Sequence, residues 1–357
     1  MSNIKITKTE NTRFQNVDWK NLRFGVYFSD HMYVADYENG IWNKGEILPY
    51  GPLQFEPTLC TLHYGQSIFE GLKAFRCKGG GANIFRPDMN AKRLNHSATR
   101  LCIPEFPNEL LIDAMKELVK IDNKFLPETR GQSLYIRPVA FGSSSFLGVH
   151  PSTDYKLVVV MSPVASYYPE GLAPVKILVE SEFVRAARGG LGSAKTAANY
   201  AASLYAGQQA KNSGFAQVLW LDAVTHNFID EVGAMNIMFV INGELVTPPL
   251  ETGTILAGVT RDSAIKLARE WGYNVSERAL SIAEVFEAYD KGELKEVFGT
   301  GTAAVISPVG ILKYKDREIV INNNEIGPIA QRLFDTITGI QYGEIEDKYG
   351  WNVHINF

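Results

Sequence analysis

A single lysine follows a run of small residues near the middle of the chain. Residues 189–196 read Gly-Gly-Leu-Gly-Ser-Ala-Lys-Thr, and an alanine-rich stretch that predicts a helix begins directly after the lysine. Glycines let the backbone approach a ligand closely, so such a turn is typical of a place where a molecule other than water lies against the chain. Lys195 is therefore the first candidate for catalysis.

Three interpretations of this lysine compete. The spacing Gly-x-x-x-x-Ala-Lys-Thr differs by one residue from a phosphate-binding P-loop, and Val218–Asp222 resembles the aspartate strand that holds magnesium in P-loop nucleotidases. A lysine among small residues also suits a Schiff base with pyridoxal phosphate, because small neighbours leave room for a flat ring. The third interpretation is a glycine turn whose lysine is simply solvated.

Other groups that pyridoxal phosphate requires follow Lys195 in the chain. Ala257–Arg261 is a glycine turn that opens a helix, where backbone amides can bind a phosphate. Phe298–Ala303 is a second turn of small residues with hydroxyls, and Glu231 precedes a stretch that predicts a buried strand. Helix capping and solvent exposure would explain each feature alone. Their joint presence with Lys195 favours the cofactor.

The composition narrows the class of protein. The 357 residues are 45% apolar and 21% charged, as expected for a soluble globular protein of one large or two medium domains. A net charge of −4 and a pI near 5.9 do not favour a nucleic-acid partner, and no apolar run has the length of a membrane span. The start of the chain lacks a signal-peptide or transit pattern. Cys60, Cys77 and Cys102 have no metal-type spacing, so we expect a reduced, cytoplasmic protein without a metal site.

The N-terminal half predicts a mixed arrangement in which strands are in the majority. We expect strands at Arg23–Tyr37, Leu72–Arg76, Asn83–Pro87, Ser133–Val139 and Tyr155–Met161. We expect helices at Met89–Leu101 and Glu109–Asn123, with another starting in Gly65–Gly71.

Ser166–Pro174 contains two prolines and a glycine without periodicity and predicts a linker. The expected division is thus a smaller N-terminal domain at 1–166, a linker at 167–174 and a larger C-terminal domain at 175–357. In the last part, strands are expected at 175–179, 216–222, 235–241 and 244–247, with a final pair around 298–304, and helices at 196–210, 260–271, 283–290 and 329–340.

Asn242-Gly243 predicts a hairpin turn, and Ser281 with Glu284 predicts a helix-capping box. The hairpin weakens the nucleotidase interpretation, because P-loop folds need regular strand–helix–strand crossovers to build a parallel sheet.

A series of ordered motifs resembles the branched-chain amino acid aminotransferases, in the longer variety that includes the vertebrate enzymes. The resemblance runs from about Phe24 to Trp351, and its motifs are Phe24-Gly, Phe28-Ser-Asp-His-Met, Leu62-His-Tyr, Phe69-Glu-Gly, Phe85-Arg-Pro, Ser133-Leu-Tyr-Ile-Arg-Pro, Val218-Leu-Trp-Leu, Glu231-Val-Gly, Gly258-Val-Thr-Arg and Glu296-Val-Phe-Gly.

The family resemblance implies a two-domain α+β fold of the fold type IV class of pyridoxal phosphate enzymes, like that of D-amino acid aminotransferase. It also implies a homodimer that transaminates leucine, isoleucine and valine with 2-oxoglutarate by a ping-pong mechanism. D-amino acid aminotransferase and aminodeoxychorismate lyase are the alternatives within the fold, and a nucleotidase or an inactive binding protein is a remote one.

The same resemblance assigns roles at the cofactor. It implies that Lys195 forms the Schiff base, that Tyr200 donates to the phenolic oxygen and that Glu231 pairs with the pyridine nitrogen. The residues that it assigns to the phosphate are Arg93, Val259, Thr260 and Thr302.

For the substrate, the resemblance implies a pocket built from Phe24, Tyr64, Phe69 and Tyr135, with Ala303 near the substrate carboxylate and with Leu147 and Val149 reaching in from the partner subunit. Arg137 is our candidate for the second carboxylate of 2-oxoglutarate; a structurally paired arginine is the alternative there.

Two positions depart from the family pattern. Ala234 stands where close relatives often carry threonine, so a hydroxyl is absent there. Ala304 and Ser307 replace the Cys-x-x-Cys pair of vertebrate members, which excludes a thiol switch at that place.

Overall fold

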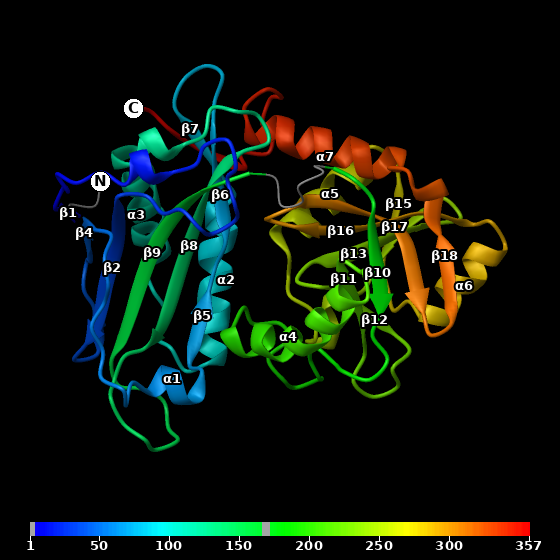
Figure 1. The fold of residues 1–357 in the computed structure, drawn as a ribbon, viewed down its shortest axis with the longest axis horizontal. Coiled ribbons are helices and arrows are strands. Elements are labelled where there is room, and N and C mark those ends of the chain that lie inside the picture. The colour runs from blue at the N-terminus through cyan, green and yellow to red at the C-terminus, as the bar shows by residue number, and fades with distance from the viewer. Residues whose placement is uncertain (1–3, 166–171) are drawn as a thin grey trace. The chain divides into compact units, whose positions relative to one another are not determined.

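The computed structural model describes residues 4–165 and 172–357, which belong to two compact units (Figure 1). The first unit comprises Met1–Tyr167, Ala194–Ala197 and Gly339–Phe357, and the second comprises Tyr168–Ser193 and Ala198–Thr338. Lys195 therefore belongs to the first unit, although the segments that end at Ser193 and begin at Ala198 belong to the second. The linker expected at 166–174 falls partly on residues 166–171, outside the described residues, and the linear division into two domains stays a prediction.

The first unit contains a ten-stranded sheet in the order β1-β4-β2-β9-β8-β6-β7-β19, with β3 paired to β2 and β5 to β8. Only β1 and β4 pair in parallel among the described strands of this sheet. The strands are β1 (Lys5–Ile6), β2 (His31–Glu38), β3 (Ile41–Trp42), β4 (Glu46–Pro49), β5 (Ser67–Phe69), β6 (Leu72–Arg76), β7 (Ala82–Phe85), β8 (Ser133–Gly142), β9 (Tyr155–Val164) and β19 (Asn352–Ile355).

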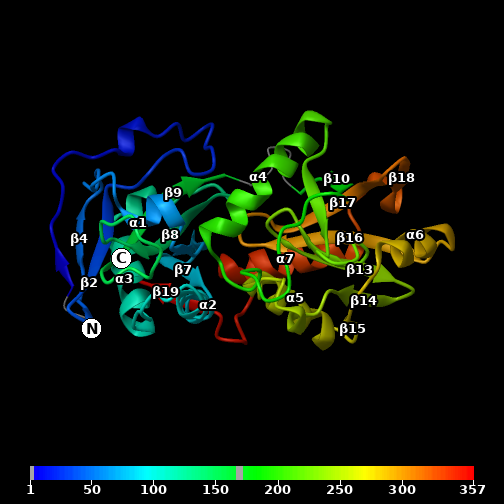
Figure 2. The same cartoon turned by 90° about the horizontal axis from the view of Figure 1, so that it is seen from below.

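Two helices, α2 (Pro87–Arg100) and α3 (Asn108–Ile121), cover one face of this sheet (Figures 1 and 2). Leu94 of α2 and Met115 of α3 pack with Tyr33 of β2 in the main core of the unit. The alternate residues Met32 and Val34 belong to a second apolar cluster, as the two-residue period of a strand requires. The unit also contains α1 (Cys60–Tyr64) and the 3-10 turns Phe14–Asn16 and Asn123–Phe125.

The second unit contains a nine-stranded sheet in the order β12-β11-β10-β17-β16-β13-β14-β15, with β18 paired to β17. Its strands are β10 (Val175–Val179), β11 (Gln217–Leu221), β12 (Ile229–Val232), β13 (Asn236–Ile241), β14 (Glu244–Thr247), β15 (Asn274–Glu277), β16 (Leu294–Gly301), β17 (Val305–Tyr314) and β18 (Arg317–Val320).

The remaining helices are α4 (Ala197–Asn212), α5 (Val259–Glu270), α6 (Ile282–Asp290) and α7 (Pro328–Gln341), with 3-10 turns at Leu250–Thr252 and Ile321–Asn324. β10 and β11 pair in parallel with α4 between them in the chain, but β12 then pairs antiparallel to β11. The two mixed sheets and seven α-helices within residues 4–165 and 172–357 confirm the predicted mixed α/β class. None of the helices in the described part of the chain has the length and apolar character that crossing a bilayer requires.

Locally determined elements agree with the sequence. Asn242 and Gly243 take positive φ angles of 49° and 78° in the turn between β13 and β14, and the Ser281 hydroxyl accepts a hydrogen bond from the Glu284 amide at 3.0 Å. The hydrogen bonds of both motifs join residues that are close in the chain. The motifs therefore form independently of the tertiary structure around them.

Two predicted elements are wrong. The strand expected at Arg23–Tyr37 begins only at His31, because Gly25 adopts a left-handed φ of 68° and the residues around it form turns. The helix expected to start in Gly65–Gly71 has instead ended at Tyr64, since Gly65 is its left-handed cap with φ 65°, and β5 follows.

Candidate active site

Backbone hydrogen bonds place Lys195 against the sheet and a helix of the first unit. The Lys195 carbonyl accepts from the Phe69 amide of β5 at 3.0 Å, and the Lys195 amide donates to the Ser97 hydroxyl of α2 at 2.9 Å. The Thr196 hydroxyl donates to the Ser67 carbonyl at 2.8 Å. The backbone at Lys195 is thus fixed by both a strand and a helix of the first unit.

The ammonium group of Lys195 lies in aromatic and cationic surroundings. Its Nζ is 4.8 Å from the centre of the Phe69 ring. The pKa of Lys195 is lowered to about 8, mainly by burial; the charges of Arg93 and Arg137 act in the same direction, and Glu70 opposes the change. A lysine with this pKa is neutral, and so nucleophilic, in a far larger fraction of molecules at neutral pH than an exposed lysine.

A buried ion pair lies beside this lysine. Glu70 is fully buried, and its two carboxylate oxygens accept from Nε and Nη2 of Arg93 at 2.7 and 2.8 Å. Asn90 adds a hydrogen bond to the same carboxylate at 2.7 Å. Asn90, Arg93 and Ser97 share one face of α2 because they are three and four residues apart. Although burial raises the pKa of Glu70, the charge of Arg93 and its hydrogen bonds outweigh it and the pKa is lowered.

Aromatic side chains surround Arg137 on β8 in the same unit. Arg137 donates from Nη2 to the Tyr135 hydroxyl at 2.9 Å, and its guanidinium carbon is 4.7 Å from the centre of the Phe69 ring. The rings of Phe24 and Tyr135 meet edge to face at 4.8 Å. The structure therefore brings four of the expected substrate residues, Phe24, Phe69, Tyr135 and Arg137, into one group with Lys195.

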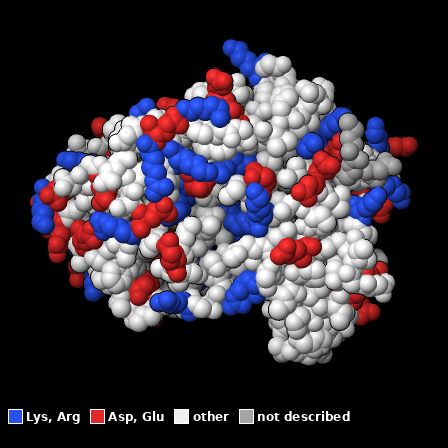
Figure 3. Space-filling model, turned by 180° about the vertical axis from the view of Figure 1, so that it is seen from behind, with Lys and Arg blue, Asp and Glu red and all other residues white. Residues whose placement is uncertain are grey.

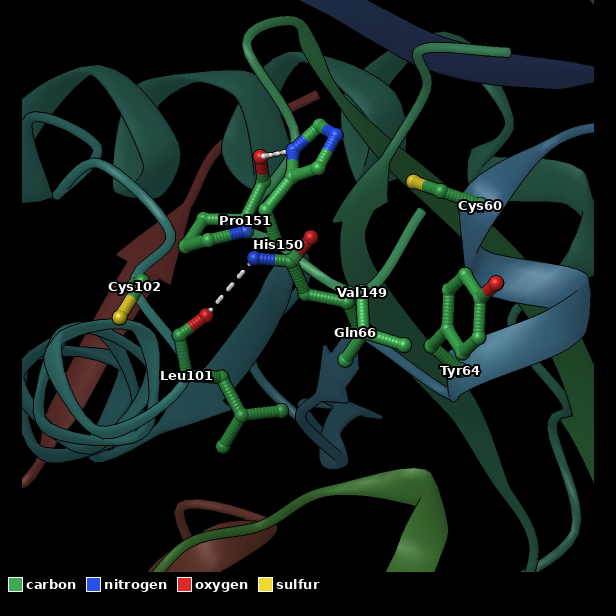
Figure 4. A pocket seen from close by; sticks show the side chains of 8 residues that line it. All are labelled: Cys60, Tyr64, Gln66, Leu101, Cys102, Val149, His150 and Pro151. Carbon is green, nitrogen blue, oxygen red and sulfur yellow. Dashed lines mark hydrogen bonds between the residues drawn. The ribbon is translucent and has the colours of Figure 1, made fainter. Parts of the chain in front are cut away.

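Three other expected substrate residues, Tyr64, Leu147 and Val149, lie close together at a pocket of the first unit. The Tyr64 hydroxyl donates to the Leu147 carbonyl, and Tyr64 and Val149 line a pocket of about 340 Å³ with Cys60 and His150 (Figure 4). Leu147 and Val149 are 63% and 86% exposed. Large apolar groups so exposed are typical of a surface that another molecule covers.

Glu231 is a buried carboxylate of the second unit. It lies within β12 rather than before a strand, and it is 2% exposed. Its Oε1 accepts from the Leu256 amide at 2.8 Å, and its Oε2 is 2.9 Å from Nε of Arg185. Tyr200, Glu231 and Ala234 line one small pocket with Arg185. Two residues that the sequence assigns to the cofactor, Tyr200 and Glu231, are thus brought together in the second unit.

The start of α5 has the form of an anion site. Gly258 is its N-cap, and Val259 and Thr260 are its first residues. A side chain at position 258 would meet the Asn236 amide oxygen at 2.0 Å, so the backbone here runs close to its neighbour. On β16, the buried Thr300 hydroxyl has no hydrogen-bond partner among the described residues. Thr302 and Ala303 follow in the turn before β17.

Two residues of these groups were not singled out as site residues from the sequence. Glu70 lies inside the Phe69-Glu-Gly71 motif, so that motif was its only signal. Arg185 has no local pattern, because its partners Glu231, Thr254 and Gly192 come from three separate segments.

The surface charge and the potential metal ligands give little evidence about the function. Lysine and arginine are interspersed with aspartate and glutamate on the face shown in Figure 3. Among the described residues, no group of three or more histidine, cysteine, aspartate or glutamate side chains could hold a metal ion.

Comparison with known proteins settles the family. Residues 67–311 match the family described as Amino-transferase class IV. The chain belongs to this family. This class IV aminotransferase is 53% identical to a probable branched-chain-amino-acid aminotransferase of Staphylococcus epidermidis over 99% of this chain and 98% of that protein. It is 51% identical to branched-chain-amino-acid aminotransferase 2 of Bacillus subtilis, over 99% and 96% of the two chains.

Solved structures agree with this assignment. The Escherichia coli branched-chain amino acid aminotransferase is 30% identical, with a TM-score of 0.77 over 92% of this chain and 99% of that one. A second branched-chain amino acid aminotransferase, solved in complex with N-(5'-phosphopyridoxyl)-L-glutamate, is 28% identical with a TM-score of 0.75 over 91% and 98% of the chains. The fold is that of the fold type IV aminotransferases.

Proposed function

We propose that this aminotransferase uses pyridoxal 5'-phosphate to move the amino group of leucine, isoleucine or valine to 2-oxoglutarate. The observation that carries the proposal is the amine of Lys195, which is held against Phe69 with its pKa lowered to about 8. Relatives that share about half of the sequence are named branched-chain-amino-acid aminotransferases, which supports the substrate class.

The residues present suit the cofactor. A phosphate ester needs amides, hydroxyls and a cation, and the α5 N-terminus, the partnerless Thr300 hydroxyl and Arg93 are groups of these kinds among the described residues. A pyridinium needs a carboxylate that stays ionised in a buried place, and Glu231 is paired with Arg185. We assign Arg93, Val259, Thr260 and Thr302 to the phosphate, Glu231 to the ring nitrogen and Tyr200 to the phenolic oxygen.

When bound, the cofactor supplies a conjugated ring that accepts the electrons released at the substrate Cα. Lys195 would hold the cofactor through its amine, and when a substrate amine takes that place the free amine of Lys195 would serve as the base that moves the Cα proton. Its lowered pKa suits this base, because a neutral amine is required near neutral pH. Glu231 would keep the ring nitrogen protonated.

The substrate side chain must be either a branched alkyl group or a chain that ends in a carboxylate. We assign the apolar walls to Phe24, Tyr64, Phe69 and Tyr135 and the substrate carboxylate to Ala303. Arg137 suits the second carboxylate, since its guanidinium is hydrogen-bonded to Tyr135 and stacked on Phe69 and so needs little reordering.

We also propose a homodimer in which Leu147 and Val149 enter the substrate pocket of the partner subunit. Their exposure of 63% and 86% supports this, because a covering subunit would remove that apolar surface from water. A cytoplasmic location is a further proposal, supported by three cysteines that are all free thiols.

Single-turnover kinetics of each half-reaction, followed by the absorbance of the bound cofactor, test the substrate class. We expect L-leucine, L-isoleucine and L-valine to react with the pyridoxal form, and 2-oxoglutarate to regenerate it. A protein that binds the cofactor but reacts with D-alanine and not with L-leucine would contradict the proposed substrates.

A further inference from the structure

The buried carboxylate of Glu231 has a cationic partner with three directed contacts. Nε of Arg185 lies 2.9 Å from Oε2 of Glu231, and the two side chains are 7% and 3% exposed. Nη1 of Arg185 donates to the Thr254 carbonyl at 2.7 Å, and Nη2 donates to the Gly192 carbonyl at 3.2 Å. All three guanidinium nitrogens are therefore used, each toward a different segment of the second unit.

The neighbouring carboxyl group, that of Asp230, shows how burial changes a pKa when, among the described residues, no cation contacts the group directly. Asp230 precedes Glu231 on β12 and is also buried, at 5% exposed, and its Oδ1 accepts from the Thr254 hydroxyl at 2.9 Å. Burial raises the pKa of Asp230 to about 6, although Thr254 and the charge of Arg185 act the other way. Adjacent residues of a strand point to opposite faces, so Arg185 is not placed to contact both carboxylates in the same way.

The same guanidinium fixes the glycine turn. Gly192 packs so closely on Thr254 that a Cβ at position 192 would lie 2.3 Å from the Thr254 carbonyl oxygen. Arg185 bonds to the carbonyls of both residues and so joins this turn to the segment that ends at Leu256, whose amide donates to Oε1 of Glu231. Gly192 is three residues before Lys195 in the chain. Arg185 thus orders two segments that carry proposed cofactor residues.

Lysine could not make this arrangement. An ammonium is a single point charge on a flexible stem, whereas the guanidinium directs N–H groups in a fixed plane toward a carboxylate and two carbonyls. Asn236 adds a hydrogen bond to Oε1 of Glu231 at 3.2 Å. Both carboxylate oxygens therefore have partners, with Arg185 at Oε2 and Asn236 at Oε1.

We infer that Arg185 is a positioning residue that keeps Glu231 ionised and oriented for the cofactor's ring nitrogen and that locks the glycine turn before Lys195. This inference rests on the proposed role of Glu231 at the pyridine nitrogen. Removing a guanidinium from a buried carboxylate leaves a charge that the interior does not stabilise, and the carboxylate takes up a proton.

Carbon-13 NMR of glutamate carboxyls in the cofactor-free protein tests the first half without any activity. The Glu231 signal is assigned by its loss in Glu231→Gln. We expect the shift of an ionised carboxylate in the wild type at neutral pH, and a shift toward that of the protonated acid in Arg185→Met. A Glu231 signal that stays ionised in Arg185→Met would overturn the inference.

Cofactor affinity tests the second half. We expect Arg185→Met to weaken pyridoxal phosphate binding by about 10- to 100-fold, the loss typical of a hydrogen bond to a charged group. In a Glu231→Gln background the same substitution should cost less affinity, because only the contacts of Arg185 with the glycine turn and Thr254 then remain to be lost. Equal losses in the two backgrounds would show that Arg185 does not act through Glu231.

Two further variants separate this role from a general loss of folding. Arg185→Lys keeps the charge, so Glu231 should stay ionised while affinity falls part of the way. Arg278→Met removes the guanidinium from the Arg278–Glu284 pair of the same unit and should leave cofactor affinity unchanged. If Arg185→Met does not fold, Arg185→Lys provides the test. A cofactor affinity of Arg185→Lys equal to that of the wild type would overturn the inference. A wild-type protein without affinity for the cofactor contradicts the proposed function instead.

Discussion

Nε of Arg93 lies 2.7 Å from Oε1 of Glu70, and this ion pair is buried beside Lys195. The side chains are 10% and 0% exposed, so neither charge can be solvated if the other is removed. The pair also acts on Lys195, whose pKa Arg93 lowers and Glu70 raises.

Glu70→Gln should therefore destabilise the cofactor-free protein by about 3–5 kcal/mol, the usual cost of breaking a buried ion pair from one side. Urea unfolding in phosphate-free buffer measures this free energy. The double variant Glu70→Gln with Arg93→Met removes both charges and should recover part of the loss. A single variant as stable as the wild type would show that the pair is not buried in solution.

Lys195 should make the stability of the cofactor-free protein depend on pH. Its folded pKa of about 8 lies below the ordinary value of 10.5, so between these values the unfolded chain binds more protons than the folded one. The free energy of unfolding contributed by this group therefore rises as the pH increases from about 8 to 10.5.

Lys195→Met should remove part of this rise, as urea unfolding over a pH series would show. Lys73 is a matched control, because burial also lowers its pKa to about 8 and it lies on β6 of the same unit. Each single variant should lose part of the rise. Identical pH dependence in Lys195→Met and the wild type would contradict the lowered pKa.

Arg137→Met should slow the 2-oxoglutarate half-reaction by about 10- to 100-fold more than the leucine half-reaction, because only 2-oxoglutarate brings a second carboxylate. Tyr135→Phe keeps the guanidinium and removes only its 2.9 Å hydroxyl partner, so the difference should be smaller. Single-turnover rates with the two substrates give the ratio. Equal losses in both half-reactions would remove Arg137 from this role.

Gly71→Ala should also slow the 2-oxoglutarate half-reaction more than the leucine half-reaction, although it replaces no charged residue. A Cβ at position 71 would lie 1.9 Å from the Tyr135 hydroxyl oxygen, so Tyr135 must move and its hydrogen bond with Arg137 is lost. Gly79→Ala is the control, since no atom lies within 4 Å of its added Cβ. Steady-state constants for 2-oxoglutarate should worsen in the first variant only.

The sequence predicted features that depend on neighbouring residues. The Asn242-Gly243 turn and the Ser281 cap formed as expected because their hydrogen bonds are local. The glycines before Lys195 make it a candidate from the sequence alone, because glycines indicate close approach of the backbone to a ligand.

Features that depend on distant segments could not be read in this way. Arg23–Tyr37 has strand-forming residues throughout, yet the residues before His31 form turns and bends. In this part the Asp30 carboxylate accepts a hydrogen bond from the Arg13 amide at 2.6 Å. The contacts of Arg185 join three segments, and those of Glu70 join a strand end to α2. No periodicity encodes such pairings, so the supporting residues of the site appeared only in the structure.

Borohydride reduction of the purified protein, followed by peptide mapping, tests the central claim most directly. Reduction fixes any covalent link between a lysine and pyridoxal phosphate. We predict a single phosphopyridoxyl group on Lys195 in the wild type and none in Lys195→Ala. A modified lysine at another position, or a wild-type protein that catalyses transamination without any labelled lysine, would contradict the account.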